Sequence, residues 1–153
     1  MAKTIRGGAP CSIARTVDVL KDPWSFMVLR EAMAGVTRFA DFKAALGIAS
    51  DILTDRLNAM VEAGVLRREQ YQDPGSRARY SYHLTDVGAA LQTVLGALQQ
   101  WGDQHLPWPE GPTVERMHSR TGRPLHVGFV DDRGREVAAA DVNFVRTAAY
   151  PQR

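Results

Sequence analysis

Four arginines and only two carboxylates occur between residues 67 and 79 of the chain. Guanidinium groups bind phosphate oxygens through paired hydrogen bonds, so a local excess of arginine suggests an anionic partner. Arg77 and Arg79 are two residues apart, so in an extended segment both side chains leave the same side of the backbone. We expect one of them to bind phosphate and the other to enter a narrow, electronegative groove. Arg38 lies at the start of a predicted helix, where it could contact a phosphate beside the helix amides.

A short helix predicted from residue 50 to residue 63 carries groups that could contact bases. Leu53 and Leu57 mark its inward face, so the polar residues lie on the opposite face and its shoulders. The residues that we expect at the groove are Ser50, Asp51, Thr54, Asp55 and Arg56. Hydroxyls bond to either base type, arginine pairs with guanine or phosphate, and aspartate accepts from cytosine. Because two carboxylates repel phosphate, the alternative of a solvated face on an ordinary core helix stays open.

Apolar spacing predicts three helices ahead of this one. They run from Cys11 to about residue 20, from about residue 24 to residue 35, and from residue 37 to residue 46. Asp22 is placed to cap the second helix. Gly47 should end the third helix, and Ser50 should cap the fourth. Two short helices joined by so tight a turn predict a helix-turn-helix, whose second helix usually enters the major groove of DNA.

Two predicted strands, residues 65–72 and 79–84, flank a turn that contains proline and glycine. In the second strand we expect Tyr80, Tyr82 and Leu84 to pack, and Arg79, Ser81 and His83 to meet solvent or phosphate. Thr85 is then predicted to cap one long helix that continues to Leu106. This order of elements favours a winged helix-turn-helix, a mainly α member of the α+β class, with added helices at both ends.

Length and charge limit the possible functions. The chain has 153 residues, enough for one principal domain, which we place at residues 11–106 after a loose arm at 1–10. A net charge of +2 excludes a non-specific nucleic-acid coat. No apolar run reaches the about 18 residues that span a bilayer, and no signal-peptide core is present, so we expect a cytoplasmic protein without a membrane partner. A single cysteine agrees with a reducing compartment.

The run from Cys11 to Leu106 resembles the HxlR-type winged helix-turn-helix transcriptional regulators of the MarR-like superfamily. The landmarks are Cys11, Asp22, Trp24, Arg38-Phe39, Leu53 to Leu57, Gly64, Arg79 to Tyr82, Leu84-Thr85, Gly88 and Trp101 to Asp103. The resemblance implies a homodimer, joined through the first and last helices, that binds an inverted-repeat operator in double-stranded DNA. Repression is the commoner outcome in this family. We expect dimer contacts from Ile13, Val17, Leu91, Leu95, Leu98 and Trp101.

Cys11 has two interpretations. The resemblance implies that some relatives sense electrophiles or oxidants through the matching cysteine, which would make a small molecule an effector of this protein. Cys11 is also the only thiol and lies at a predicted helix start. The alternative is a small apolar residue that packs at the start of the first helix.

Residues 107–153 resemble the cysteine-bearing extension of some relatives, whose paired cysteines suggest a zinc ribbon. Thr121-Gly122 and the run from Asp131 to Gly134 stand here where those cysteines would be. Without thiolates a zinc site loses its best ligands, and the histidines show no recognised ligand spacing. We expect a degenerate ribbon with no metal and no cofactor. Residues 125–130, ahead of the turn at 131–134, predict a small β-hairpin.

Two competing functions can be weighed against a DNA-binding regulator. An enzyme would need a nucleophile with its base, paired carboxylates or a phosphate loop, and the sequence contains none of the corresponding motifs, so we do not expect one. A winged helix that binds a protein in place of DNA is the closer alternative, because Asp51 and Asp55 are poorly suited to a phosphate-lined groove.

Overall fold

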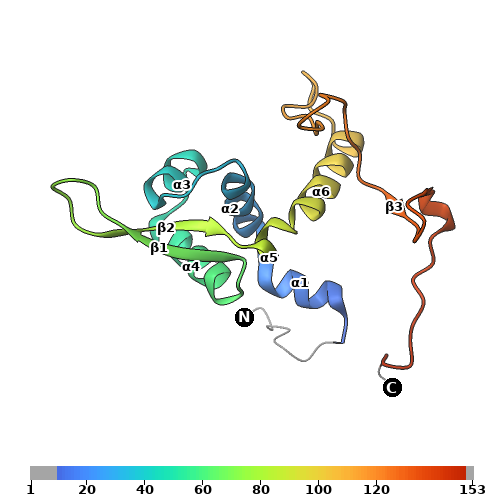
Figure 1. Cartoon of the computed structure of the whole chain (residues 1–153), viewed down its shortest axis with the longest axis horizontal. Helices are drawn as coiled ribbons and strands as arrows, with labels where there is room; N and C mark the ends of the chain where they lie inside the picture. The colour runs from blue at the N-terminus through green and yellow to red at the C-terminus, as the bar shows by residue number, and fades with distance from the viewer. Residues whose placement is uncertain (1–9, 151–153) are drawn as a thin grey trace. The chain divides into compact units, whose positions relative to one another are not determined.

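The computed structural model describes residues 10–150, which form two compact units. The first unit extends to Leu91 and the second begins at Gln92. Figure 1 follows the order of the elements along the chain. The expected arm, residues 1–10, lies outside the described residues except for Pro10. The first unit is mainly helical and contains a small antiparallel hairpin. This arrangement confirms the prediction of a winged helix-turn-helix fold.

Four helices form most of the first unit: α1 Ser12–Leu20, α2 Pro23–Met33, α3 Phe39–Leu46 and α4 Ser50–Glu62. Asp22 caps α2 as predicted, because its Oδ1 accepts the backbone N–H of Ser25 at 3.1 Å. The prediction that Ser50 caps α4 is wrong. Ala49 is the last extended residue, so Ser50 is already helical and its side chain cannot reach the free amides ahead. Its carbonyl instead accepts the hydroxyl of Thr54 at 2.7 Å.

The core of the first unit lies where α2, α3, α4 and the start of the hairpin meet. Its largest fully buried side chains are Phe42, Leu29, Leu53, Leu57, Met60, Leu66 and Val28. Removing such a side chain from water stabilises a fold by about 1.5 to 3 kcal/mol. Because Leu53 and Leu57 are wholly buried, the rotation of α4 about its own axis is fixed. The polar face of α4 is therefore presented to solvent.

The hairpin, here called the wing, consists of β1 Leu66–Tyr71, β2 Arg79–Leu84 and the turn between them. The strands pair antiparallel from Leu66↔Leu84 to Tyr71↔Arg79. Gly75 has φ 75°, which the turn requires and glycine tolerates. The wing also receives a short third segment, because the N–H of Tyr82 bonds to the carbonyl of Thr37 at 2.8 Å.

Ser81 was expected to face solvent or phosphate, and the structure buries it to 8% exposure. The segment Thr37-Arg38 lies beside β2 at this point, because Arg38 forms a β-bridge with Ser81. This segment covers Ser81. The Ser81 hydroxyl donates to the carbonyl of Glu69 at 3.3 Å and also lies 2.8 Å from Nε2 of His83. Tyr82 is buried as predicted, whereas Tyr80 remains 45% exposed.

The long helix expected after Thr85 is in fact two helices, α5 Asp86–Ala89 and α6 Gln92–His105. Thr85 caps α5 as predicted, because its hydroxyl oxygen accepts the N–H of Gly88 at 3.0 Å. A Cβ on Gly88 would lie 2.1 Å from the carbonyl oxygen of Val65, so only glycine permits this close packing. The N–H of Leu91 then bonds to the carbonyl of Gly88, three residues back, which interrupts the α-helical hydrogen bonding.

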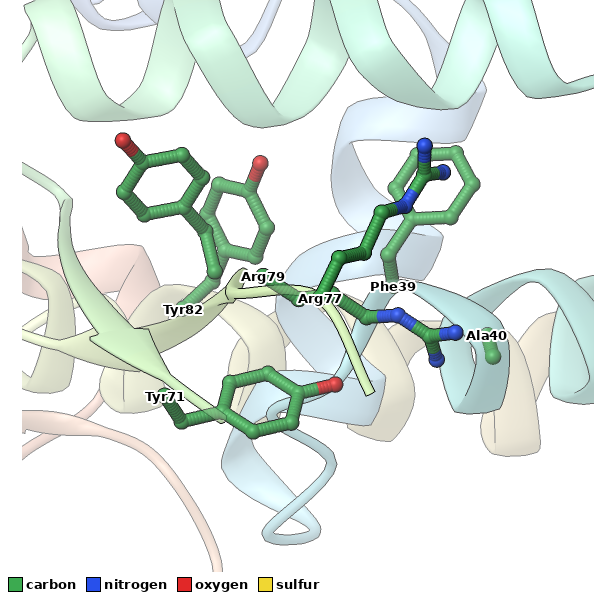
Figure 2. Close-up of a pocket in the computed structure, with 7 residues that line it drawn as sticks. Phe39, Ala40, Tyr71, Arg77, Arg79 and Tyr82 are labelled. Carbon is green, nitrogen blue, oxygen red and sulfur yellow. The ribbon is translucent and has the colours of Figure 1, made fainter. Parts of the chain in front are cut away.

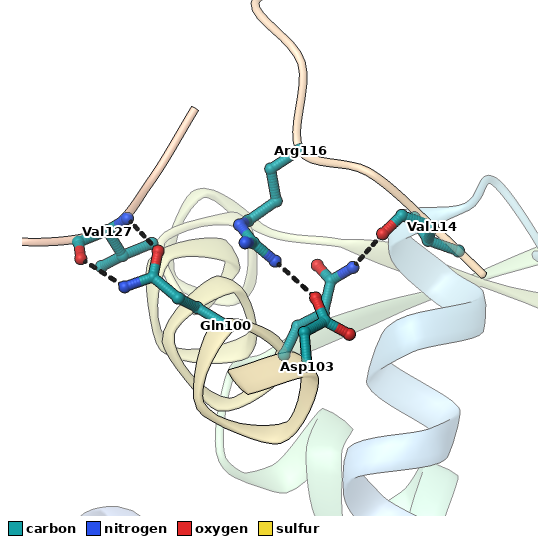
Figure 3. A network of polar contacts seen from close by, with 6 residues as sticks. Gln100, Asp103, Val114, Arg116 and Val127 are labelled. Atoms are coloured by element: carbon teal, nitrogen blue, oxygen red, sulfur yellow. Dashed lines mark hydrogen bonds and ion pairs between the residues drawn. The ribbon is translucent and has the colours of Figure 1, made fainter. Parts of the chain in front are cut away.

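The second unit contains α6, the strands β3 Phe129–Val130 and β4 Glu136–Val137, and the short 3-10 helix η1 Ala139–Asp141. The pair Phe129↔Val137 confirms the hairpin predicted at the turn 131–134. Three polar side chains of α6 hold the chain that follows (Figure 3). Gln100 both accepts the N–H of Val127 and donates to its carbonyl, Gln99 donates to the carbonyl of Val114, and Asp103 pairs with Arg116. The boundary between the units therefore precedes α6.

Candidate nucleic-acid interface

A hollow lies between the start of α3 and the wing, and it contains two of the predicted site residues (Figure 2). Its volume is about 330 Å³, and its lining residues are Phe39, Ala40, Tyr71, Arg77, Arg79, Tyr80 and Tyr82. Phe39 and Ala40 belong to the first turn of α3, and the others come from the wing. The hollow therefore combines aromatic side chains with cationic ones.

Arg77 and Arg79 are both exposed, and among the described residues neither has an ion pair or a side-chain hydrogen bond. The other wing arginines have partners. Arg67 pairs with Glu69, and Arg68 stacks on Tyr80 with 4.4 Å from its guanidinium carbon to the ring centroid. The two arginines without partners thus supply positive charge that no carboxylate of the described chain neutralises.

Arg38 links α3 to the tip of the wing. Its guanidinium pairs with both carboxylate oxygens of Asp73, at 3.2 and 3.3 Å, and stacks on Tyr71 at 4.4 Å from the ring centroid. These contacts join residues 35 positions apart. A contact of Arg38 with the DNA backbone stays a prediction. In the structure its charge is shared with Asp73, so its pull on phosphate is weaker than that of Arg77 or Arg79.

Burial raises the pKa of the Tyr82 hydroxyl above its ordinary value, and this effect exceeds the opposing attraction of Arg68. The ordinary pKa of a tyrosine already lies well above neutrality, so the phenol is protonated at neutral pH.

The solvent face of α4 carries the residues predicted to contact bases. Four of them are exposed: Ser50 and Thr54, which lie one turn apart, and Asp51 and Asp55, which also lie one turn apart. Asn58 is exposed one turn after Thr54. Thr54 donates its hydroxyl proton to the Ser50 carbonyl, so its oxygen remains free to accept. This face therefore offers mainly hydrogen-bond acceptors, which suit the amino groups of cytosine and adenine.

Arg56 differs from the other predicted α4 contacts. Its Nη2 forms an ion pair with Oδ2 of Asp22 at 2.6 Å, and its side chain is only 23% exposed. Asp22 uses its other oxygen to cap α2, so one carboxylate joins the start of α2 to the middle of α4. The structure thus gives Arg56 a contact inside the domain, which engages its guanidinium away from the exposed polar face of α4.

Asp22→Ala is expected to lower the free energy of unfolding by about 2 kcal/mol, because it removes a helix cap and an ion pair that is mostly shielded from solvent. Asp22→Asn should cost about half as much, since asparagine caps helices well but cannot neutralise Arg56. Urea unfolding of the two variants, followed by circular dichroism, measures the difference. Equal losses for Ala and Asn would contradict the assignment of a separate role to the ion pair.

Cys11 is exposed and is the last residue before α1. Its side chain makes no capping hydrogen bond, so the thiol is not used by the helix. The exposure removes the interpretation of Cys11 as a buried packing residue within this chain.

Four of the six expected dimer residues are exposed, two on α1 and two on α6. On α1, Ile13 is 71% and Val17 is 51% exposed, and on α6, Leu98 is 51% and Trp101 is 58% exposed. Leu91 and Leu95 are half-buried. On α6 the exposed residues follow helical spacing, so they form one apolar stripe, defined here by Val94, Leu98 and Trp101.

No group of three histidine, cysteine, aspartate or glutamate residues within positions 10–150 is arranged to hold a metal ion. The two turns of the extension are closed by protein groups. Nδ1 of His118 accepts the N–H groups of Arg120 and Thr121 in one turn. In the other turn, the backbone and the guanidinium of Arg135 donate to Asp131, and these bonds lower the pKa of its carboxyl. A side-chain acceptor thus closes each turn.

In the same part of the chain, no helix has the length and apolar character needed to cross a bilayer.

Sequence patterns alone did not reveal the aromatic part of the hollow. Tyr71, Tyr80 and Phe39 alternate with arginines along the chain, which is a signal for stacking. The alternation of the strand predicts Tyr80 only as a packing residue. The side of the hollow formed by Phe39 and Ala40 could not be found this way, because it depends on how the start of α3 packs against the wing.

The family model described as HxlR-like helix-turn-helix matches residues 19–110. Rv3095 of Mycobacterium tuberculosis, an uncharacterized HTH-type transcriptional regulator, is 35% identical over 133 residues, which cover 86% of this chain and 82% of Rv3095.

Two solved structures extend the comparison. PA1607, a candidate transcription factor, is 34% identical with a TM-score of 0.78, and the match covers 92% of this chain and 97% of PA1607. HypR, described as a redox regulator and solved in its oxidized form, is 25% identical with a TM-score of 0.55. That match covers 62% of this chain and 97% of HypR. The similarity to PA1607 therefore includes the extension as well as the winged helix.

Proposed function

Because the chain belongs to the HxlR-like helix-turn-helix family, whose matched relatives are transcriptional regulators, we propose that it binds one specific operator sequence as a homodimer and represses the adjacent gene. The observation that carries this proposal is the pair of exposed arginines without carboxylate partners, Arg77 and Arg79, on the same domain as the exposed polar face of α4. A winged helix uses these two surfaces together, the helix for bases and the wing for the backbone.

In the proposed complex, the N-terminal half of α4 lies in the major groove. Asp51 and Asp55 accept hydrogen bonds from exocyclic amino groups of bases, and Thr54 contacts either base type. Ser50, at the first turn, contacts a base edge or the neighbouring phosphate. Because carboxylates near phosphates are costly, the affinity must come from the wing and the specificity from α4. Arg38 supports the wing and adds a weaker backbone contact.

A selection from random double-stranded DNA tests this proposal without knowledge of the operator. We expect the full-length protein to enrich one motif built as an inverted repeat, with half-sites about one helical turn apart. Thr54→Ala should enrich a motif changed at one or two positions of each half-site. Enrichment of no motif by the wild-type protein would contradict sequence-specific binding.

The proposed dimer is supported by the different contacts of the two faces of α6. Gln99, Gln100 and Asp103 hold the extension on one face, and Leu98 and Trp101 lie on the opposite face. The extension therefore leaves the apolar stripe uncovered within its own unit. A twofold partner that presents the same stripe would remove it from water, as an isologous interface requires.

We further propose that Cys11 makes DNA binding responsive to oxidants. Support comes from its exposure and from the similarity to HypR, which is described as a redox regulator. With no second cysteine in the chain, oxidation must give a sulfenic acid, a mixed disulfide with a small thiol, or a bridge to the Cys11 of the twin subunit. Each product adds bulk or a tether at α1, where dimer contacts are proposed.

Diamide with glutathione is expected to release the wild-type protein from its operator, whereas Cys11→Ser should bind DNA equally well with and without the oxidant. Fluorescence anisotropy of a labelled operator measures both, and a reductant should restore the wild-type signal. If diamide released both proteins equally, or released neither, Cys11 would not be the sensor.

One observation favours the alternative that this winged helix binds a protein in place of DNA. The exposed carboxylates of Asp51 and Asp55 would suit a basic protein surface as well as they suit base amino groups. A protein-binding winged helix would show no motif in the DNA selection. The same experiment therefore separates the two functions.

A further inference from the structure

We propose that the C-terminal tail, defined as residues 142–150, of each copy adds a strand to the hairpin β3–β4 of its twin, so that the two extensions fold together. The proposal rests on the homodimer proposed above, because the exchange needs a second copy. It goes beyond the apolar stripe of α6, since it assigns a partner to the extension.

The second unit lacks a core of its own. None of the residues from 92 to 150 is buried, and the unit exposes large apolar side chains, among them Leu125, Phe129, Val130, Phe144 and Val145. Removing such side chains from water is the main favourable contribution to folding, and a chain segment of this length has little to spare. The second unit is therefore incomplete within one chain.

The hairpin of this unit is too small to be stable alone. Each of β3 and β4 has only two residues, and an isolated two-stranded hairpin is at best marginally stable in water. In a sheet of two strands, each strand has one edge whose backbone groups are unpaired. Phe129 and Val130 are both exposed, and as neighbours in β3 they point to opposite faces. A third strand would therefore gain backbone hydrogen bonds at an edge and apolar contacts on both faces.

The tail has the properties of such a strand. Val142 is extended, with φ −94° and ψ 125°, and residues 143–146 make no backbone hydrogen bond within the described chain. Residues 142–149 contain no proline, so every amide can donate to a neighbouring strand. Phe144 is 87% and Val145 is 80% exposed, and in an extended segment they point to opposite faces. The tail thus presents apolar groups on both faces, as β3 does.

These features identify a second copy as the partner. β4 ends at Val137 and the tail begins at Val142, so its own sheet is within reach of the tail, yet that sheet contains only β3 and β4. A twin subunit offers the same unpaired edge. The proposed interface on α6 brings the twin close, because Gln99, Gln100 and Asp103 anchor the extension to that helix. Identical chains exchange a segment at low cost, since the contacts are of the same kind.

The apolar area is sufficient for such an exchange. A fully covered phenylalanine removes about 150 to 250 Å² from water. Each copy contributes Phe129 and Phe144 as well as Val130 and Val145. Over both copies these side chains approach the roughly 1,200 Å² that a stable interface buries, and the stripe on α6 adds to it.

Photocrosslinking of the full-length protein tests the exchange. Phe144→benzoylphenylalanine keeps an aromatic ring at position 144 and makes it photoreactive. Denaturing electrophoresis separates crosslinks between copies, which double the mass, from crosslinks within one chain. We expect crosslinks between copies that map to residues 125–137. Crosslinks within single chains, crosslinks that map elsewhere, or none would overturn the proposal. Glu110→benzoylphenylalanine, at an exposed position outside the hairpin and the tail, is the control and should not label residues 125–137.

Hydrogen exchange of backbone amides measures whether the tail completes the sheet. Val145→Asp should speed exchange of the β3 and β4 amides about tenfold or more and leave the amides of α2 and α4 unchanged, because a carboxylate cannot pack on the apolar face of the hairpin. Asn143→Asp adds the same charge on the same face of the tail, at an exposed polar position, and should exchange like the wild-type protein. Equal exchange of the hairpin amides in the two variants would overturn the proposal.

Ultracentrifugation separates failure of this inference from failure of the proposed function. A dimer whose crosslinks all lie within single chains would refute the exchange and leave the homodimer standing. A monomer would refute both. A dimer with exchanged tails that selects no DNA motif would refute the regulator and leave the exchange intact.

Discussion

The double variant Arg77→Ala/Arg79→Ala should bind the operator roughly a hundredfold more weakly than the wild-type protein at 0.15 M salt. Both arginines are exposed and have no ion-pair partner within residues 10–150, so their removal should leave the core and the wing strands unchanged. A homodimer carries two wings and would lose four cations. If each neutralises one phosphate, the slope of log K against log salt becomes shallower by up to about 3.6.

Measuring the affinity at several salt concentrations gives both the loss of affinity and the slope of log K against log salt. Arg133→Ala serves as the charge-matched control, because Arg133 is an exposed arginine in the extension whose side chain makes no ion pair or hydrogen bond with residues 10–150. Its slope should equal that of the wild-type protein. An unchanged affinity and slope in the double variant would show that the wing does not contact the DNA backbone.

Leu98→Glu should convert the proposed dimer into monomers and abolish specific binding. Leu98 is central in the apolar stripe of α6, and a carboxylate there would have to enter the interface without a partner. The expected loss is roughly a thousandfold in dimer affinity. Operator binding should fall with it, because one winged helix reads only half of an inverted repeat.

Analytical ultracentrifugation at micromolar concentration measures the mass of each variant. Gln92→Glu is the matched control, since it adds the same charge to an exposed position of the same helix on the face away from the stripe. It should remain dimeric. If the wild-type protein had the mass of a monomer, both free and on operator DNA, the proposed homodimer would be wrong.

Local signals in the sequence predicted much of the fold. Asp22, Gly47 and Thr85 act where predicted because a cap depends only on residues within one helical turn. The turn of the wing and the small hairpin of the extension are likewise set by proline, glycine and aspartate at the turns themselves. Such interactions can be recognised without knowing the rest of the fold.

Some of the errors arise because distant segments decide the outcome. Ser81 is buried because Arg38 bridges to it. The failure of Ser50 as a cap is local, because α4 begins one residue earlier than predicted. The candidate site shows the same division. The exposed face of α4 followed from helical spacing, whereas the ion pair between Arg56 and Asp22 joins residues far apart in sequence and could not be anticipated.

A shift assay on promoter fragments at 50 and 200 mM salt tests the central claim most directly. The account predicts that the full-length protein forms a discrete complex with one fragment at both salt concentrations and tolerates an excess of unrelated DNA. The complex should weaken by at least tenfold between the two concentrations, because the wing arginines release counterions from phosphate. Binding to no fragment at 50 mM salt, or equal binding to every fragment, would contradict the claim that this winged helix reads an operator.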